Sequence, residues 1–132
     1  MADLTFKHKN NQKKEISIFA SGPITYAALA TPSDTLFTLP KASLVTNVYA
    51  IVTDAAGLGD TLDVVVGTTV VADEIAISAL GVASGTVAKT YFPTGGIVTC
   101  VAGAGAALVE ASTYKIVVEY IETELAEGTY TD

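Results

Sequence analysis

The stretch from Leu36 to Gly67 limits the possible folds most, because it holds two long runs of strand-forming residues. The runs are Ser43–Asp54 and Thr61–Gly67, and both are rich in valine. The sequence AAGLGD joins them, and its two glycines can adopt the positive φ angles of turns. This arrangement predicts two β-strands connected by a hairpin-type loop.

The spacing of apolar side chains indicates which faces these strands bury. In Thr61–Gly67 one side of the predicted strand carries Leu62, Val64 and Val66, and the other carries Asp63 and Val65. Ser43–Asp54 carries apolar residues at both odd and even positions, which predicts a strand covered on both faces.

Other segments have the same strand character. The predicted strands are Ile16–Ala20, Thr35–Leu39, Thr86–Phe92, Ile97–Val101 and Thr113–Thr123, the last with the most regular alternation. Two segments are ambiguous. Ile24–Ala30 fits either a strand or one or two helical turns. Thr68–Ser78 predicts two strands broken at Ala72-Asp73, with a short helix opening at Asp73 as the alternative.

About eight short strands, punctuated by Gly and Pro, predict an all-β fold, an antiparallel β-sandwich or jelly roll. The chain has 132 residues, which suits one such domain. We expect residues 16–123 to form the sandwich, residues 1–15 a flexible basic N-terminal arm, and residues 124–132 an acidic C-terminal tail.

Charge argues against a nucleic-acid partner, and the length of the apolar runs argues against a membrane partner. The net charge is −7 and none of the seven basic residues is Arg, so the sequence predicts no nucleic-acid partner. No apolar run is long enough to cross a bilayer, and no signal peptide is recognisable, so we expect synthesis in the cytoplasm and no membrane partner. Only 16% of residues are charged and 50% are hydrophobic, which favours burial of surface against other copies or a partner.

The N-terminal arm concentrates positive charge. Lys7, Lys9, Lys13 and Lys14 lie there, together with His8, the single histidine. Two interpretations remain open: a frayed, solvated terminus, or a basic arm that becomes ordered when it docks on an acidic neighbour.

No motif predicts catalysis or a cofactor. Cys100 is the single cysteine and is expected to be a buried thiol, with no disulfide and no metal site. Ile97–Ala111 resembles the start of a dinucleotide-binding unit, but Leu108 stands where the third glycine belongs, so a loop between closely approaching strands is favoured. Asp60, Asp63 and the Asp73-Glu74 pair are expected to be solvated loop carboxylates. The chain is therefore predicted not to be an enzyme.

Two parts of the sequence resemble small structural proteins of tailed bacteriophages. The first is LPKASLVTNVYAIVTDAAGLGDTLDVVVG, with a corner at Leu39-Pro40-Lys41-Ala42, a long valine-rich strand and a second strand that ends at Gly67. The second is VAGAGAALVEASTYKIVVEYIE, a Gly/Ala loop before a final strand that contains tyrosine. The resemblance covers about residues 35 to 122.

These proteins are similar to capsid decoration (cement) proteins with jelly-roll cores. The resemblance implies a virion protein that binds the major capsid protein on the outside of the head and staples neighbouring capsomers. It also implies a homo-oligomer, for which the analogy favours a trimer over a dimer. The residues implied in capsid or subunit contact are Lys7, Lys9, Lys13, Lys14, Tyr26, Tyr91 and Phe92, with Tyr49 and Tyr120 as further aromatic anchors.

Two other functions fit the same features. One is a receptor- or carbohydrate-binding jelly-roll module of a fibre, although the absence of Trp disfavours it. The other is a neck or tail-completion protein, which would differ in copy number per particle.

Overall fold

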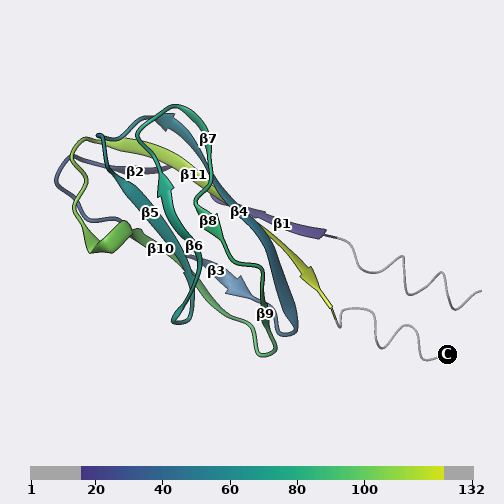
Figure 1. Ribbon diagram of the computed structural model, residues 1–132. Helices are drawn as coiled ribbons and strands as arrows, with labels where there is room; N and C mark the ends of the chain where they lie inside the picture. Colours follow the sequence, from purple (N-terminus) through teal and green to yellow (C-terminus); the bar gives the residue numbers. More distant parts are fainter. Residues whose placement is uncertain (1–15, 124–132) are drawn as a thin grey trace, which may run out of the picture.

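Strand β11 (Ser112–Glu122) organises the first of two antiparallel sheets in the computed structural model, which describes residues 16–123 (Figure 1). It pairs with β1 (Ile16–Ala20) and β2 (Ile24–Tyr26) along one edge and with β4 (Ser43–Asp54) along the other. The free edge of β4 then pairs with β7 (Gly81–Ala83) and β9 (Thr90–Phe92). This sheet therefore has six strands.

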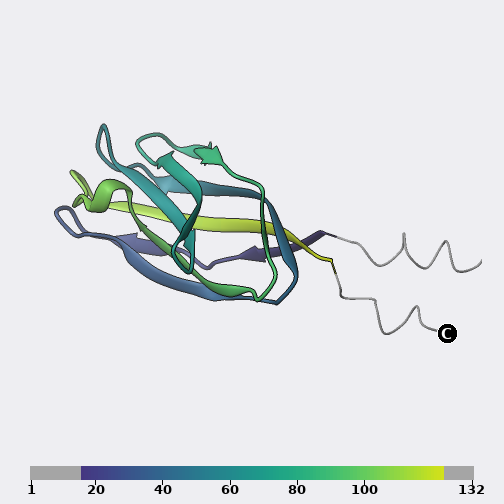
Figure 2. The ribbon, with the colours of Figure 1, turned by 60° about the horizontal axis from the view of Figure 1, so that its bottom comes forward.

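The second sheet has five strands in the order β3-β10-β5-β6-β8. These are β3 (Ser33–Leu39), β5 (Thr61–Val66), β6 (Thr69–Ala76), β8 (Thr86–Val87) and β10 (Gly96–Ala102). A short 3-10 turn, η1 (Gly103–Gly105), follows β10 and is the one helical element within residues 16–123. The predicted all-β antiparallel sandwich is confirmed (Figure 2).

The pairing scheme defines a jelly roll. β1 and β2 both lie along β11, and β7 and β9 both lie along β4, so each pair acts as one interrupted strand. If each interrupted pair is counted as one strand, the first strand (β1 and β2) pairs with the last (β11). In the same way β3 pairs with β10, β4 with β7 and β9, and β5 with β6. This is one long hairpin rolled into two facing sheets, which is the topology of a jelly roll.

The hairpin predicted between β4 and β5 is wrong. β4 belongs to the first sheet and β5 to the second, so AAGLGD crosses from one layer to the other. β4 pairs instead with β11, and β5 with β10 and β6. A glycine loop of this length permits either path, and the partners available later in the chain decide between them.

β4 is also covered on one face only. Val45 and Val48 are both fully buried although they differ in parity, because the register against β11 shifts between Glu119 and Tyr120. This bulge switches the inward-facing residues from odd to even positions. The apolar residues on both parities of β4 therefore result from the bulge and not from two covering layers.

Three other boundaries differ from prediction. Thr86–Phe92 divides into β8 and β9, which lie in different sheets. Thr68–Ser78 forms the single strand β6, with register shifts against β5 and a positive φ of 57° at Glu74. Ile24–Ala30 is a strand only as far as Tyr26.

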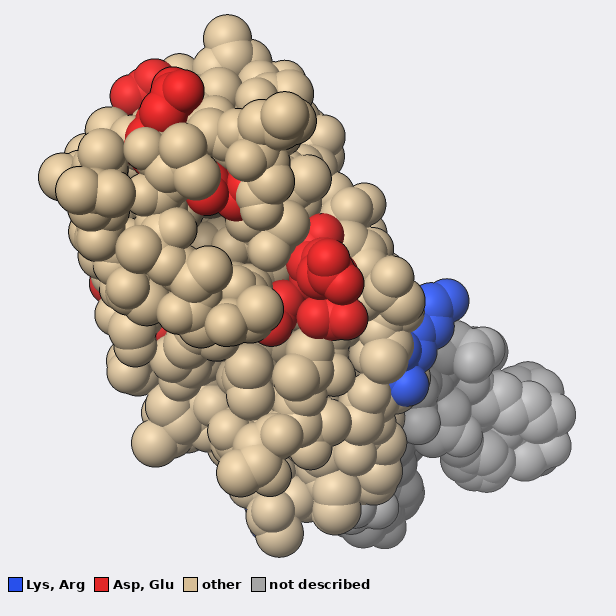
Figure 3. All heavy atoms as spheres, turned by 60° about the vertical axis from the view of Figure 1, so that its left-hand side comes forward, with Lys and Arg blue, Asp and Glu red and all other residues tan. Residues whose placement is uncertain are grey.

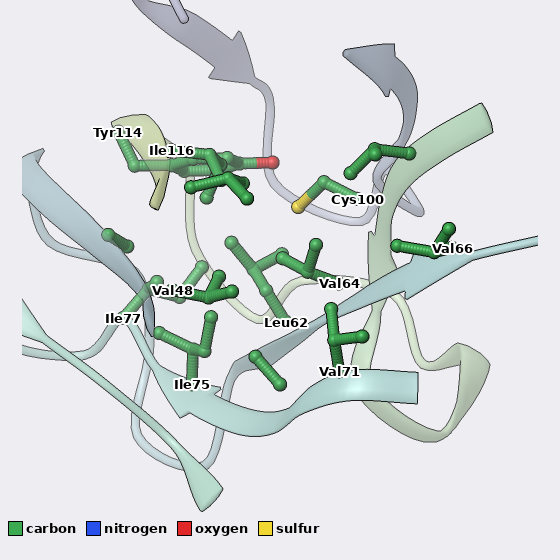
Figure 4. Packing of buried hydrophobic residues seen from close by; sticks show 14 of the residues in the cluster. Val48, Leu62, Val64, Val66, Val71, Ile75, Ile77, Cys100, Tyr114 and Ile116 are labelled. Atoms are coloured by element: carbon green, nitrogen blue, oxygen red, sulfur yellow. The ribbon is translucent and has the colours of Figure 1, made fainter. Parts of the chain in front are cut away.

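The core lies between the two sheets and is built mainly of Val, Ile and Leu (Figure 4). The aliphatic side of β5, namely Leu62, Val64 and Val66, is 0–2% exposed. Tyr114 and Cys100 are also fully buried, so the predicted buried thiol is confirmed. Burial raises the pKa of Cys100 to about 12.

The two ends of the sandwich differ (Figure 2). At one end the described chain begins at Ile16 and stops at Thr123, whose N–H donates to the Ala42 carbonyl at 2.8 Å. At the other end the β2–β3, β4–β5 and β10–β11 loops meet, and the Leu29 N–H donates to the Leu108 carbonyl at 2.8 Å. The described chain therefore begins and ends on the side opposite these loops.

Candidate interaction surfaces

The outward face of the six-stranded sheet is apolar along most of its length. Directly paired residues point to the same side of a sheet, so the strand register identifies the set. It comprises Ile16, Ile18 and Ala20 on β1, Val117 and Ile121 on β11, Leu44, Tyr49 and Ile51 on β4, Val82 on β7 and Tyr91 on β9. We call this set the outer face. Ile16, Ile18, Val82 and Tyr91 are 46–73% exposed.

The outward side of the five-stranded sheet is more polar. Its register places Ser33, Thr35 and Thr38 of β3 beside Val101, Thr99 and Ile97 of β10. Apolar side chains on this side are interrupted by hydroxyls and by Asp63 of β5. The contrast between the two sheets makes the outer face the stronger candidate for a protein contact.

A second apolar surface lies on the loops at the end away from the termini. Leu29, Leu58 and Val109 are 58–91% exposed, and each comes from a different loop. We call these three residues the loop tip. Large side chains held this far out of the core are typical of contact sites when they are clustered.

Asp60 holds the loop tip in place. Its carboxylate accepts hydrogen bonds from the backbone N–H of Gly57 at 2.8 Å and of Val109 at 2.9 Å, and a longer one from Glu110 at 3.4 Å. The residue is only 6% exposed. The prediction that Asp60 is solvated is therefore wrong, because loops from distant parts of the chain close over it.

The other predicted loop carboxylates lie on strands at the surface. Asp63 on β5 accepts a hydrogen bond from the Glu74 backbone N–H at 2.8 Å. Partial desolvation, followed by the neighbouring Asp63 carboxylate, raises the pKa of Asp73. Among residues 16–123 no group of His, Cys, Asp and Glu side chains is arranged to hold a metal ion. Figure 3 shows acidic side chains in small groups on a mostly uncharged surface.

The aromatic residues that the resemblance implies in contacts differ in how accessible they are to a partner. Tyr91 lies on the outer face and is 46% exposed. Phe92 points the other way and is 9% exposed within the core, so it offers no surface for a partner. Tyr26 donates to the Asp34 carboxylate, and its hydroxyl also accepts from the Ser33 N–H at 3.0 Å. Lys7, Lys9, Lys13 and Lys14 lie outside the described residues.

The remaining aromatic anchors are similarly divided. Tyr49 is on the outer face and partly exposed. Tyr120 faces inward, where its ring centre lies 5.8 Å from that of Phe37. Phe37 stacks in turn on Phe19 at 4.2 Å, which closes the sandwich between β1 and β3.

The Gly/Ala-rich loop after β10 has the structural role expected of it. A Cβ on Gly103 would lie 1.9 Å from the Thr61 hydroxyl, so only glycine fits this approach of η1 to β5. The chain then continues into an extended loop before β11, and no helix follows of the kind that a dinucleotide-binding unit uses.

The Tyr114 hydroxyl is buried and has no hydrogen-bond partner among the described residues. Burial, with smaller contributions from Cys100 and Asp34, raises the pKa of Tyr114. We expect Tyr114→Phe to stabilise the fold by roughly 1 kcal/mol, because a buried hydroxyl without a partner costs more than it returns. Urea unfolding measures this; a loss of stability would show that the hydroxyl makes a hydrogen bond.

Comparison with known proteins finds similarity in structure but not in sequence. No protein-family model matches the chain, and no curated protein matches it. The fold is similar to that of a chain in the cyanophage Pam1 capsid asymmetric unit, with 17% identity over 83% of this chain and 86% of that one and a TM-score of 0.62. This likeness shows a shared jelly-roll fold.

Two weaker matches are also capsid structures. One is the acidic stable capsid of the Helicobacter pylori bacteriophage KHP30, with 14% identity, coverage of 82% and 88%, and a TM-score of 0.47. The other is the VP2 subviral particle of infectious bursal disease virus, with 14% identity, coverage of 88% and 35%, and a TM-score of 0.43. Separately, no helix within residues 16–123 is long and apolar enough to cross a membrane.

Proposed function

We propose that this protein is a non-enzymatic structural component of a bacteriophage virion that binds the outside of the head and stabilises the lattice of the major capsid protein. The observation that carries the proposal is the fold shared with a chain of the Pam1 capsid. Because 83% of this chain and 86% of that chain take part, the likeness extends over nearly the whole of both proteins.

The surface properties support binding and not chemistry. The outer face and the loop tip together present apolar side chains on one broad side and at one end of the sandwich. A protein that staples neighbouring subunits needs contact area of this kind, held on a rigid scaffold, and needs no reactive group. The close-packed core and the Asp60 hydrogen bonds supply that rigidity.

The segments outside the sandwich add a second kind of contact. Residues 1–15 carry Lys7, Lys9, Lys13 and Lys14, and residues 124–132 are acidic. The described chain starts at Ile16 and stops at Thr123, and both lie at the same end of the sandwich because Ile16 pairs with Ile121. We propose that the basic arm clasps an acidic part of the capsid, which would tether the domain after its apolar contacts have formed.

The proposal predicts that purified protein adds to expanded heads that lack it. Occupancy should saturate at a fixed number of copies per head and should raise the temperature at which the heads lose integrity. Sedimentation of heads with bound protein measures occupancy, and electron microscopy locates it. Heads that bind none at micromolar protein would contradict the proposal.

A variant that lacks residues 2–14 tests the arm. We expect its sandwich to remain folded and its occupancy on heads to fall, most clearly at low salt, where the charge attraction of the arm is least screened. Removal of residues 125–132 is the matched control, because it deletes a terminal segment of opposite charge from the same end. Equal occupancy of the arm-deleted and intact proteins would rule out the arm as a clasp.

A further inference from the structure

The outer face has a charge arrangement that is complementary to itself. Among the positions of β11 that lie on the outer face, two are charged, Lys115 and Glu119. On β4 the residue opposite Lys115 is Ile51 and the residue opposite Glu119 is Asn47, and on β1 the residue opposite Glu119 is Ile18. Neither charge therefore has an oppositely charged residue directly opposite it, although Asp54, opposite Thr113, lies on the diagonal from Lys115.

Val117 lies midway between these two charges and is only 5% exposed. A half-turn about an axis at the level of Val117 reverses the direction of the strand. It therefore brings Lys115 to the position of Glu119 and Glu119 to the position of Lys115. A charge of each sign at equal distances from a midpoint lets a two-fold contact pair opposite charges twice, because the same patch meets itself.

We propose that the outer face binds the outer face of a second copy of this chain, with β11 stacked antiparallel on β11 about a two-fold axis at the level of Val117. Lys115 of each copy then faces Glu119 of the other. The axis lies between the six-stranded sheets of the two copies and runs perpendicular to their strands. This contact is two-fold, in place of the three-fold association that the resemblance implies.

The size of the face suits a stable dimer. Eleven residues of β11 span about 36 Å, and four strand positions side by side span about 19 Å, giving roughly 700 Å² on each copy. Stable protein contacts bury about 800 Å² on each partner. Facing sheets lie about 10 Å apart, a gap that Lys and Glu side chains reach across together.

The dimer is tested with the full-length protein by sedimentation equilibrium over a range of concentrations. We expect a monomer–dimer equilibrium for the natural sequence. Lys115→Glu and Glu119→Lys should each raise the dimer dissociation constant roughly tenfold or more, because two attractive pairs become repulsive. The double variant, Lys115→Glu with Glu119→Lys, should return close to the natural value because both pairs are restored with reversed signs.

Lys41→Glu is the matched control, because it changes the net charge as Lys115→Glu does but lies exposed at the β3–β4 corner. It should leave the dissociation constant unchanged. A natural protein that stays monomeric or forms trimers would overturn the inference, as would a double variant that is as weak as the two single variants. The dimer buries the outer face and leaves the loop tip for other contacts. The inference does not depend on capsid binding: dimers that fail to add to heads would refute the proposed function alone.

Discussion

Replacing Asp60 with alanine is expected to remove roughly 3 kcal/mol of folding stability, because backbone N–H groups lose a charged acceptor in a site that water does not reach. The groups concerned belong to Gly57, Val109 and Glu110. Asp60→Asn keeps one acceptor oxygen and should lose about half as much. Urea unfolding monitored by circular dichroism measures the difference.

Asp54→Ala is the control for this experiment. Asp54 ends β4, only six residues before Asp60, but its side chain is exposed. Its loss should change stability by less than about 0.5 kcal/mol. If Asp60→Ala were as mild as Asp54→Ala, the carboxylate would not be what fastens the loops.

The second large effect is expected at Gly95, at the opposite end of the sandwich. Its φ is +71°, and a Cβ there would lie 2.1 Å from the Leu39 carbonyl oxygen. Gly95→Ala therefore combines a left-handed backbone with a collision against main chain, and we expect a loss of about 3 kcal/mol or more.

Alanine substitutions at three other glycines distinguish the cost of the left-handed backbone from the cost of the collision. Gly59 has a φ of +89° and open space around it, so Gly59→Ala carries only the conformational cost of about 1 kcal/mol. Gly85 has no positive φ, but a Cβ there would lie 2.0 Å from the Asp73 carbonyl oxygen, so Gly85→Ala carries only the collision. Gly22 has neither feature. The expected order of stability loss is Gly22, then Gly59, then Gly85, then Gly95; a Gly95→Ala protein as stable as Gly59→Ala would contradict it.

Local sequence pattern was sufficient to locate most strands. β1 and β4 begin and end where the alternation predicts, and β11 is displaced by one residue. Such patterns depend on neighbours in the chain, which sequence displays directly. The bacteriophage resemblance also holds at the level of fold, since a jelly roll of similar extent occurs in the Pam1 capsid.

Which sheet each strand joins could not be predicted, because it depends on partners far away in sequence. β4 and β5 are consecutive, yet β4 pairs with β11 and β5 with β10. The same limit explains Asp60, whose burial requires a loop almost fifty residues further on.

The outer face could not be predicted from the sequence for a related reason. Its members come from five different strands, and only the register aligns Ile18, Glu119 and Asn47 across the sheet. Once that register is known, the separation of Lys115 and Glu119 about Val117 follows from the sequence of β11 alone.

The central position of β11 has a consequence for how the protein is made. β1, β2 and β4 all pair with a strand that the ribosome synthesises after them, so most of the six-stranded sheet can form only once Glu122 has emerged. Until then the nascent chain holds apolar strands without partners, a state open to aggregation. We therefore expect folding to follow synthesis and to be completed late, with the outer face assembled at the same moment as the core beneath it.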